Sequence, residues 1–178
     1  EIISQIKPTI IGGYNSSNFD WEWLFERSQL LGIDTTKFKT LNPNEGLKRK
    51  KGLIKLGAEV EGYNKIEIWG YNSIDIAHSV RRAQTINSDI KSWGLKYITK
   101  FSKSNKPNRV YVPGDKIAST YEENKQFYLN ETNGKYEPID KPELKDLDKR
   151  FPNTYKKVSG EYIVERYLLD DLWETMEV

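Results

Sequence analysis

Residues 10–34, IIGGYNSSNFDWEWLFERSQLLGID, constrain the fold more than any other part of the chain. A short apolar run enters two glycines, which predicts a buried strand over residues 9–14 that ends where the backbone needs freedom. The apolar residues after Asp20 recur at helical spacing as far as Gly32, which predicts a helix with a glycine stop. The segment therefore predicts a strand, a tight polar turn and a helix, with an acid at the start of the helix.

The next part of the chain alternates between strand and helix patterns. After a polar connection over residues 34–46, alternating apolar and polar residues predict strands over 53–77. Helices are predicted over 77–90 and in GLKYITKF at 94–101. Together with the first strand and helix, this order predicts a mixed α/β fold.

The segment 102–150 differs in composition, being rich in Lys, Asn, Glu and Pro. Its Asn133–Gly134 pair predicts the turn of a β-hairpin, so we interpret the segment as an insertion that carries a hairpin. A long helix is predicted to follow it, with Ser159 as the N-cap.

Composition narrows the chemistry. The chain has no cysteine and a single histidine, His78, so cysteine nucleophiles are excluded and zinc sites are disfavoured. Any metal would be held by carboxylates, which favours magnesium or manganese. The net charge of +2 is too small to attract the whole chain to nucleic acid. No apolar run approaches the roughly 20 residues that a membrane-spanning helix requires. The absence of cysteine favours the cytoplasm.

The last helix contains a second acid that requires a partner. At 100° per residue, Asp171 is predicted to lie on an apolar arc, whereas Asp170 is predicted to point outward and form a surface ion pair with Arg166. The other members of the arc are Ile163, Val164, Tyr167, Leu168, Leu172 and Thr175. A carboxylate on an apolar face is costly unless it is paired or binds a metal.

Asp20 and Asp171 therefore suggest one shared cation site. Tyr167 precedes Asp171 by one helical turn, so its hydroxyl could reach the same place. Acids with a nearby phenol suit two-metal hydrolysis of a phosphodiester, with the phenol orienting the attacking water. We expect the two carboxylates to converge in one cleft onto which the Tyr167 hydroxyl opens.

Two motifs in this chain resemble those of the exonuclease domain of B-family DNA polymerases. YNSSNFD, from Tyr14 to Asp20, with the helix that follows, is similar to the second exonuclease motif, Y-N-x-x-x-F-D. YLLDD places Tyr167 and Asp171 in the pattern Y-x-x-x-D of the third motif. The intervening VEGYNKIEIWGYNSIDIAHSVRR resembles the hairpin and strand of that domain, and the Lys- and Asn-rich composition is similar to bacteriophage polymerases.

The resemblance implies an RNase H-like fold, a mixed sheet flanked by helices, and 3′-to-5′ proofreading of single-stranded DNA. It implies that Asp20 and Asp171 bind two divalent ions (magnesium or manganese) and that Tyr167 positions the water. Asn15 and Phe19 would line the path of the 3′ end. The resemblance implies two partners, single-stranded DNA and the rest of a polymerase polypeptide, and no membrane. It also implies a location in the cytoplasm, which would be that of the host if a phage encodes the chain.

One departure from the family pattern limits this expectation. No Asp-x-Glu of the first exonuclease motif lies within residues 1–19. The chain is therefore expected to be a partial exonuclease domain over 1–178, incomplete at its N-terminal side, with 102–150 as the insertion. By itself it is expected to be nearly inactive.

Alternative interpretations remain for the whole chain and for single residues. The chain could be a non-catalytic nucleic-acid-binding module of RNase H-like shape, or a different RNase H-like exonuclease. Asp20 could be only an N-cap, and Asp171 could pair with a buried Arg or Lys. Asp75 is expected to make a structural hydrogen bond, and the basic run 48–51 to be a solvated loop or a phosphate contact. His78 is interpreted as structural, and Trp21, Trp23 and Trp93 as core.

Overall fold

The computed structural model describes residues 2–35, 46–122, 125–141 and 146–178. Most of the predicted polar connection over 34–46 lies outside the described residues, as do short parts of the 102–150 segment. The described chain is a mixed α/β structure, as predicted, and it divides into two compact units, Glu1–Ile98 and Thr99–Val178. None of its described helices is long and apolar enough to cross a membrane.

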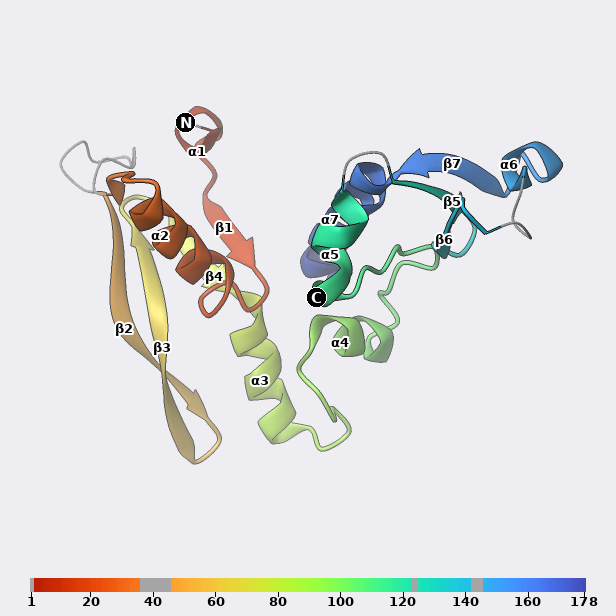
Figure 1. The fold of residues 1–178 in the computed structure, drawn as a ribbon. Helices are drawn as coiled ribbons and strands as arrows, with labels where there is room; N and C mark the ends of the chain where they lie inside the picture. The colour runs from red at the N-terminus through yellow and green to blue at the C-terminus, as the bar shows by residue number, and fades with distance from the viewer. Residues whose placement is uncertain (1, 36–45, 123–124, 142–145) are drawn as a thin grey trace. The chain divides into compact units, whose positions relative to one another are not determined.

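The first unit is built around two small sheets, and Figure 1 labels its elements. Strand β1 pairs in parallel with β4, and β2 forms a long antiparallel hairpin with β3. In chain order the elements are α1 (Ile2–Ile6), β1 (Ile10–Gly13), α2 (Asp20–Leu30), β2 (Leu47–Leu56), β3 (Glu59–Ile68), β4 (Asn72–Asp75), α3 (Ile76–Ile86) and α4 (Leu95–Phe101), the last of which runs across the boundary.

The strand–turn–helix prediction is largely confirmed. Helix α2 ends at Leu30, and Gly32 follows with φ +65°. The prediction that the first strand is buried is wrong, because Ile10 is exposed and the burial of β1 only alternates between exposed and half-buried. Among the described residues β1 has a strand neighbour on one side only, which leaves part of it uncovered.

Helix α2 packs on the base of the β2–β3 hairpin. Its Trp21 is buried in a cluster with residues from both strands, whereas Trp23 projects outward and is 57% exposed, against the prediction that it lies in the core. The basic run 48–51, expected to be a loop, forms part of β2. It forms a strand because it pairs in full register with β3, in which apolar Ile66 and Ile68 anchor the hairpin.

The second unit contains most of the 102–150 segment together with the last helix. Its three-stranded antiparallel sheet has the order β6-β5-β7. The elements are η2 (Gly114–Lys116), α5 (Ile117–Tyr121), β5 (Gln126–Asn130), β6 (Tyr136–Pro138), α6 (Leu147–Arg150), β7 (Tyr155–Ser159) and α7 (Gly160–Glu177). The predicted hairpin is confirmed, since Gly134 has φ +70° in the turn between β5 and β6.

Helix α7 begins as predicted. The hydroxyl of Ser159, its N-cap, accepts a hydrogen bond from the Tyr162 N–H at 3.1 Å. The core of the second unit joins Ile163 of this helix to Phe127 and Leu129 of β5. Val110 and Val112, which precede η2, and Val158 of β7 complete the cluster.

Candidate exonuclease site

Asp20 occupies the first position of α2, directly after the polar loop that follows β1. The loop turns at Asn15, whose φ is +58°, a conformation that asparagine tolerates better than most residues. The Asn15 carbonyl accepts hydrogen bonds from the N–H groups of Asn18 and Phe19, both at 3.2 Å. The N-cap residue is Phe19, which has no capping side chain, so the interpretation of Asp20 as merely an N-cap is wrong.

Asp75 fixes this loop from the end of the neighbouring parallel strand. Its Oδ1 accepts hydrogen bonds from the N–H groups of Asn15 at 2.8 Å and Ala77 at 3.1 Å, and its Oδ2 accepts one from Ser17 at 2.9 Å. Asp75 is buried, with its side chain 2% exposed, and it is also the N-cap of α3. The predicted structural hydrogen bond of Asp75 is confirmed.

Asp75 is the last residue of β4, and Asp20 follows the loop that leaves the carboxyl end of the parallel strand β1. Polar side chains that follow neighbouring parallel strands meet at this edge of a sheet. Apolar neighbours desolvate the Asp20 carboxylate, and this burial raises its pKa above the ordinary value; the negative charge of Asp75 raises the pKa further. Burial and the charge of Asp75 likewise raise the pKa of Tyr14 to about 12. Asp75 therefore shapes both the backbone and the electrostatics around Asp20.

An apolar hollow adjoins the Asp20 carboxylate. Phe19, Trp23 and Leu24 line it together with Asp20, and Phe19 is 68% exposed. Large apolar side chains held outward beside an acid offer stacking surfaces to a flat, polar ligand. The hollow thus places exposed aromatic side chains next to the Asp20 carboxylate.

On α7 the structure reverses the predicted burial of two neighbouring acids. Asp170, predicted to lie at the surface, is 0% exposed, and its Oδ2 accepts a hydrogen bond from the Val110 N–H at 2.9 Å. Lys106 and Arg166 form ion pairs with the same carboxylate. Leu168 and Leu172, predicted on the apolar arc, are exposed.

The reason for this error lies in the segment 106–112, which brings cationic side chains and backbone N–H groups to α7. These groups form ion pairs and hydrogen bonds that compensate for the burial of Asp170 and Glu174. Ile163 and Val164 near the start of α7 are buried as predicted, but farther along the helix the buried positions are the acids that meet these partners. A sequence pattern read from one helix contains no information about such partners.

Asp171 lies at the edge of the same network, where Arg109 pairs with it and with Glu174. The alternative that Asp171 pairs with a buried cation is therefore confirmed. Arg109 is 11% exposed at its side chain, and burial lowers its pKa.

Tyr167 is half-buried one turn before Asp171. Its ring packs against the core of the second unit and meets Tyr111 edge to face, with 6.3 Å between ring centroids. Burial raises the pKa of its phenol, and the nearby charge of Arg109 acts in the opposite direction. The hydroxyl is therefore protonated at neutral pH and able to donate a hydrogen bond.

The acids fit a metal site only in part. Among residues 2–35, 46–122, 125–141 and 146–178, no three acidic or histidine side chains group in a way that could hold a metal ion. Asp20 is an exposed residue whose partly desolvated carboxylate could bind a hard cation, whereas both oxygens of Asp75 accept backbone hydrogen bonds. The Asp171 carboxylate forms an ion pair with Arg109, which takes the place that a metal ion would need.

Comparison with known proteins supplies the family. The family model for the DNA polymerase family B exonuclease domain matches residues 1–98, more than half of the chain. No curated protein matches the chain. The chain belongs to the B-family DNA polymerase exonuclease domains.

The match covers one of the two predicted motifs. It includes Asn15, Phe19 and Asp20, and it ends where the first compact unit ends. Tyr167 and Asp171 lie beyond it, so their assignment to the third motif, and the convergence of Asp20 with Asp171, stay predictions. Three residues that shape the site were not predicted from the sequence: Asp75, Lys106 and Arg109. Of these, only Asp75 could have been identified, because an Asp directly before a helix pattern indicates an N-cap.

Proposed function

We propose that the chain contributes to a 3′-to-5′ exonuclease of RNase H-like fold that removes nucleotides from the 3′ end of single-stranded DNA during proofreading. The observation that carries this proposal is the partly desolvated Asp20 carboxylate beside an apolar hollow, after the loop that leaves the parallel strand β1, within a region that belongs to this exonuclease family. The reaction is hydrolysis of the terminal phosphodiester.

The hollow beside Asp20 would hold the terminal nucleotide. Exposed Phe19 and Trp23 can stack on bases without regard to sequence, as proofreading of any mismatch requires. The Asn15 side chain lies in the same loop, and its Oδ1 already accepts a hydrogen bond from the Asn18 amide at 3.1 Å. Its own amide group would donate to the phosphate or sugar of the strand.

Divalent magnesium or manganese would supply the charge that activates water and stabilises the leaving oxygen. Asp20 would serve as one ligand of that site, and its raised pKa reflects a carboxylate whose charge has too little compensation in the free protein. Asp171 does not fit a metal while Arg109 holds it, so its role as a ligand requires that ion pair to open. Tyr167 would donate a hydrogen bond that orients water.

The proposed partners are single-stranded DNA and the remainder of a B-family polymerase polypeptide, in the cytoplasm. The first exonuclease motif is not found in residues 1–19, and among the described residues no three acidic or histidine side chains group so that they could hold a metal ion. We therefore expect the 178-residue chain alone to digest DNA slowly or not at all. A polymerase polypeptide that contains the chain should digest it with magnesium or manganese.

The test is digestion of a 5′-labelled single-stranded oligonucleotide by such a polypeptide. Asp20→Asn should abolish the stepwise loss of nucleotides, and Glu26→Gln, which changes an exposed acid of the same helix, should leave it unchanged. Tyr167→Phe should slow digestion with little change in DNA binding. Normal digestion by Asp20→Asn would contradict the proposal.

A second candidate, a non-catalytic nucleic-acid-binding module, is favoured by one observation: the pairing of Arg109 with Asp171 and Glu174 gives an acid of the third motif a purely structural partner. The same assay separates the two. A module without catalysis would bind the oligonucleotide, and neither metal would cause shortening in any polypeptide that contains the chain.

A further inference from the structure

Arg109 pairs at once with two acids of α7 that lie one helical turn apart. The Nη2 of its guanidinium contacts Asp171, and the Nη1 contacts Glu174. A guanidinium is planar and presents its N–H donors as a fork, so it suits a position between two carboxylates. The two acids therefore share one cation.

The network around this cation is balanced in charge. Lys106 and Arg166 both pair with Asp170. Together with Arg109 and the two acids that it bridges, the network holds three cations and three acids, so its formal net charge is zero. These six side chains therefore offer no net negative charge to a divalent cation unless one of their own cations changes its partner.

The three acids differ in their access to solvent. The side chain of Asp171 is 30% exposed, whereas those of Asp170 and Glu174 are 0% and 1% exposed. Glu174 is also fixed by hydrogen bonds from the Thr99 hydroxyl at 3.4 Å and the Lys106 N–H at 3.3 Å. Of the three carboxylates, that of Asp171 is thus the one that an ion from solution can reach.

The main chain around Arg109 is fixed, but its side chain is held less completely. The Val110 N–H donates to Asp170 at 2.9 Å, and a Cβ added at Gly134 would lie 2.1 Å from the Arg109 carbonyl oxygen. The Nε of Arg109, by contrast, is buried and forms no hydrogen bond within the described part of the chain. The guanidinium can therefore change its partner while the main chain stays in place.

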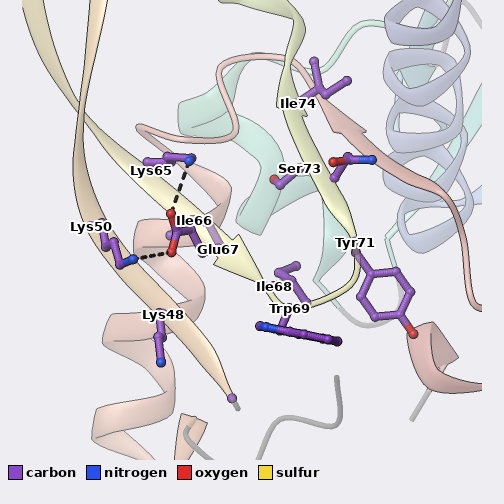
Figure 2. A pocket seen from close by; sticks show the side chains of 12 residues that line it. Lys48, Lys50, Lys65, Ile66, Glu67, Ile68, Trp69, Tyr71, Ser73 and Ile74 are labelled. Atoms are coloured by element: carbon purple, nitrogen blue, oxygen red, sulfur yellow. Dashed lines mark hydrogen bonds and ion pairs between the residues drawn. The ribbon is translucent and has the colours of Figure 1, made fainter. Parts of the chain in front are cut away.

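A surface cluster in the first unit shows why the burial of Arg109 matters. There Glu67 lies between Lys50 at 2.6 Å and Lys65 at 3.2 Å (Figure 2), and the two lysine side chains are 58% and 51% exposed. Exposed ion pairs of this kind contribute little, because water and salt compete for both charges. The Arg109 side chain is 11% exposed, so this competition is much weaker at its pairs with the two acids.

We propose that Arg109 keeps divalent cations away from Asp171, and that Glu174 retains the guanidinium when Asp171 is released. An arginine keeps its proton in proteins, so a change of pH does not remove the competing charge. Because Glu174 already contacts one arm of the guanidinium, the release leaves neither of these two buried groups unpaired. The proposal rests on the proposed function, since it takes Asp171 to be an acid of the exonuclease site.

The experiment follows the broadening by manganese of the backbone NMR signals around Asp171 in the isotope-labelled 178-residue chain, which reports binding at this place. Arg109→Met/Glu174→Gln removes the competing cation together with its buried partner, and should lower the manganese concentration at half broadening about tenfold. Addition of Asp171→Asn to this variant should cancel the gain. The matched control, Lys65→Met/Glu67→Gln, removes one cation and one acid from the surface cluster and should change nothing at Asp171.

A second variant, Arg109→Lys, decides the matter if the double variant does not fold. Lysine keeps the positive charge but has no planar fork with which to bridge two carboxylates. Arg109→Lys should therefore bind manganese at Asp171 more tightly than the native chain does. Circular dichroism checks that each variant folds.

Half broadening at the same manganese concentration in the native chain and in the folded Arg109 variants would overturn the proposal. It would also be overturned if the gain in affinity persists after Asp171→Asn, or if the control variant shows the same gain. These results do not depend on cleavage of DNA. The proposed function fails separately, if Asp20→Asn digests the oligonucleotide normally.

Discussion

The Asp75 carboxylate at the end of β4 accepts a hydrogen bond of 2.9 Å from the backbone N–H of Ser17, which lies in the loop after β1. This contact joins residues 58 positions apart in the chain. Asp75 also accepts from Asn15 and Ala77, so a single buried side chain sets the path of the backbone that leads to Asp20.

Replacement of Asp75 should therefore loosen the site. Asp75→Ala leaves three backbone N–H groups without their acceptor, and we expect a loss of about 3 kcal/mol in the free energy of unfolding, measured with urea. Asp89→Ala, which removes an exposed acid after α3, should cost under about 0.5 kcal/mol. Equal losses would show that the Asp75 hydrogen bonds contribute little.

The pKa of Asp20 leads to a prediction about pH. Because its pKa in the folded protein is raised, the acid contributes stability that is present below its unfolded pKa and is lost as pH rises through the folded value. Asp20→Asn should therefore gain stability relative to the native chain between about pH 3 and pH 7. Urea unfolding at both pH values measures this difference, and Glu26→Gln is the control. A relative loss at pH 7 would contradict the direction of the pKa shift.

The two acids of YLLDD should separate in their effects on stability. Asp170→Asn leaves Lys106 and Arg166 without their shared buried partner and should cost about 3 kcal/mol. Asp171→Asn, at a partly exposed position, should cost about 1 kcal/mol. Thermal and urea unfolding report both. If Asp170→Asn loses digestion, a folding control is needed, because the variant could simply be unfolded. If Asp171→Asn is folded and still loses digestion, Asp171 takes part in the exonuclease site.

A matched pair of glycines tests the packing of the hairpin in the second unit. Gly32 and Gly134 both have positive φ, but an added Cβ at Gly32 meets nothing within 4 Å, whereas at Gly134 it would lie 2.1 Å from the Arg109 carbonyl oxygen. Gly32→Ala should cost about 1 kcal/mol for its backbone conformation alone. Gly134→Ala should cost at least about 2 kcal/mol more, because the backbone of Arg109 must move. Similar unfolding midpoints for the two variants would show that this contact yields easily.

Elements whose signals are local could be predicted from the amino-acid sequence. Gly32, Ser159 and the Asn133–Gly134 pair each mark a helix end or a turn through the conformation or the hydrogen bond of that residue alone, and all three are present in the structure. The Y-N-x-x-x-F-D pattern was likewise enough to identify the family.

The burial of the acids and the identity of their partners depend on contacts between distant segments of the chain. Asp170 and Asp171 are neighbours of the same type, and the choice between them depends on Lys106 and Arg109, which lie more than 60 positions away. The basic run 48–51 became a strand because β3 supplied hydrogen-bond partners in register. Burial of charge and pairing of strands are energies of long-range contacts, and a pattern read along one segment cannot contain them.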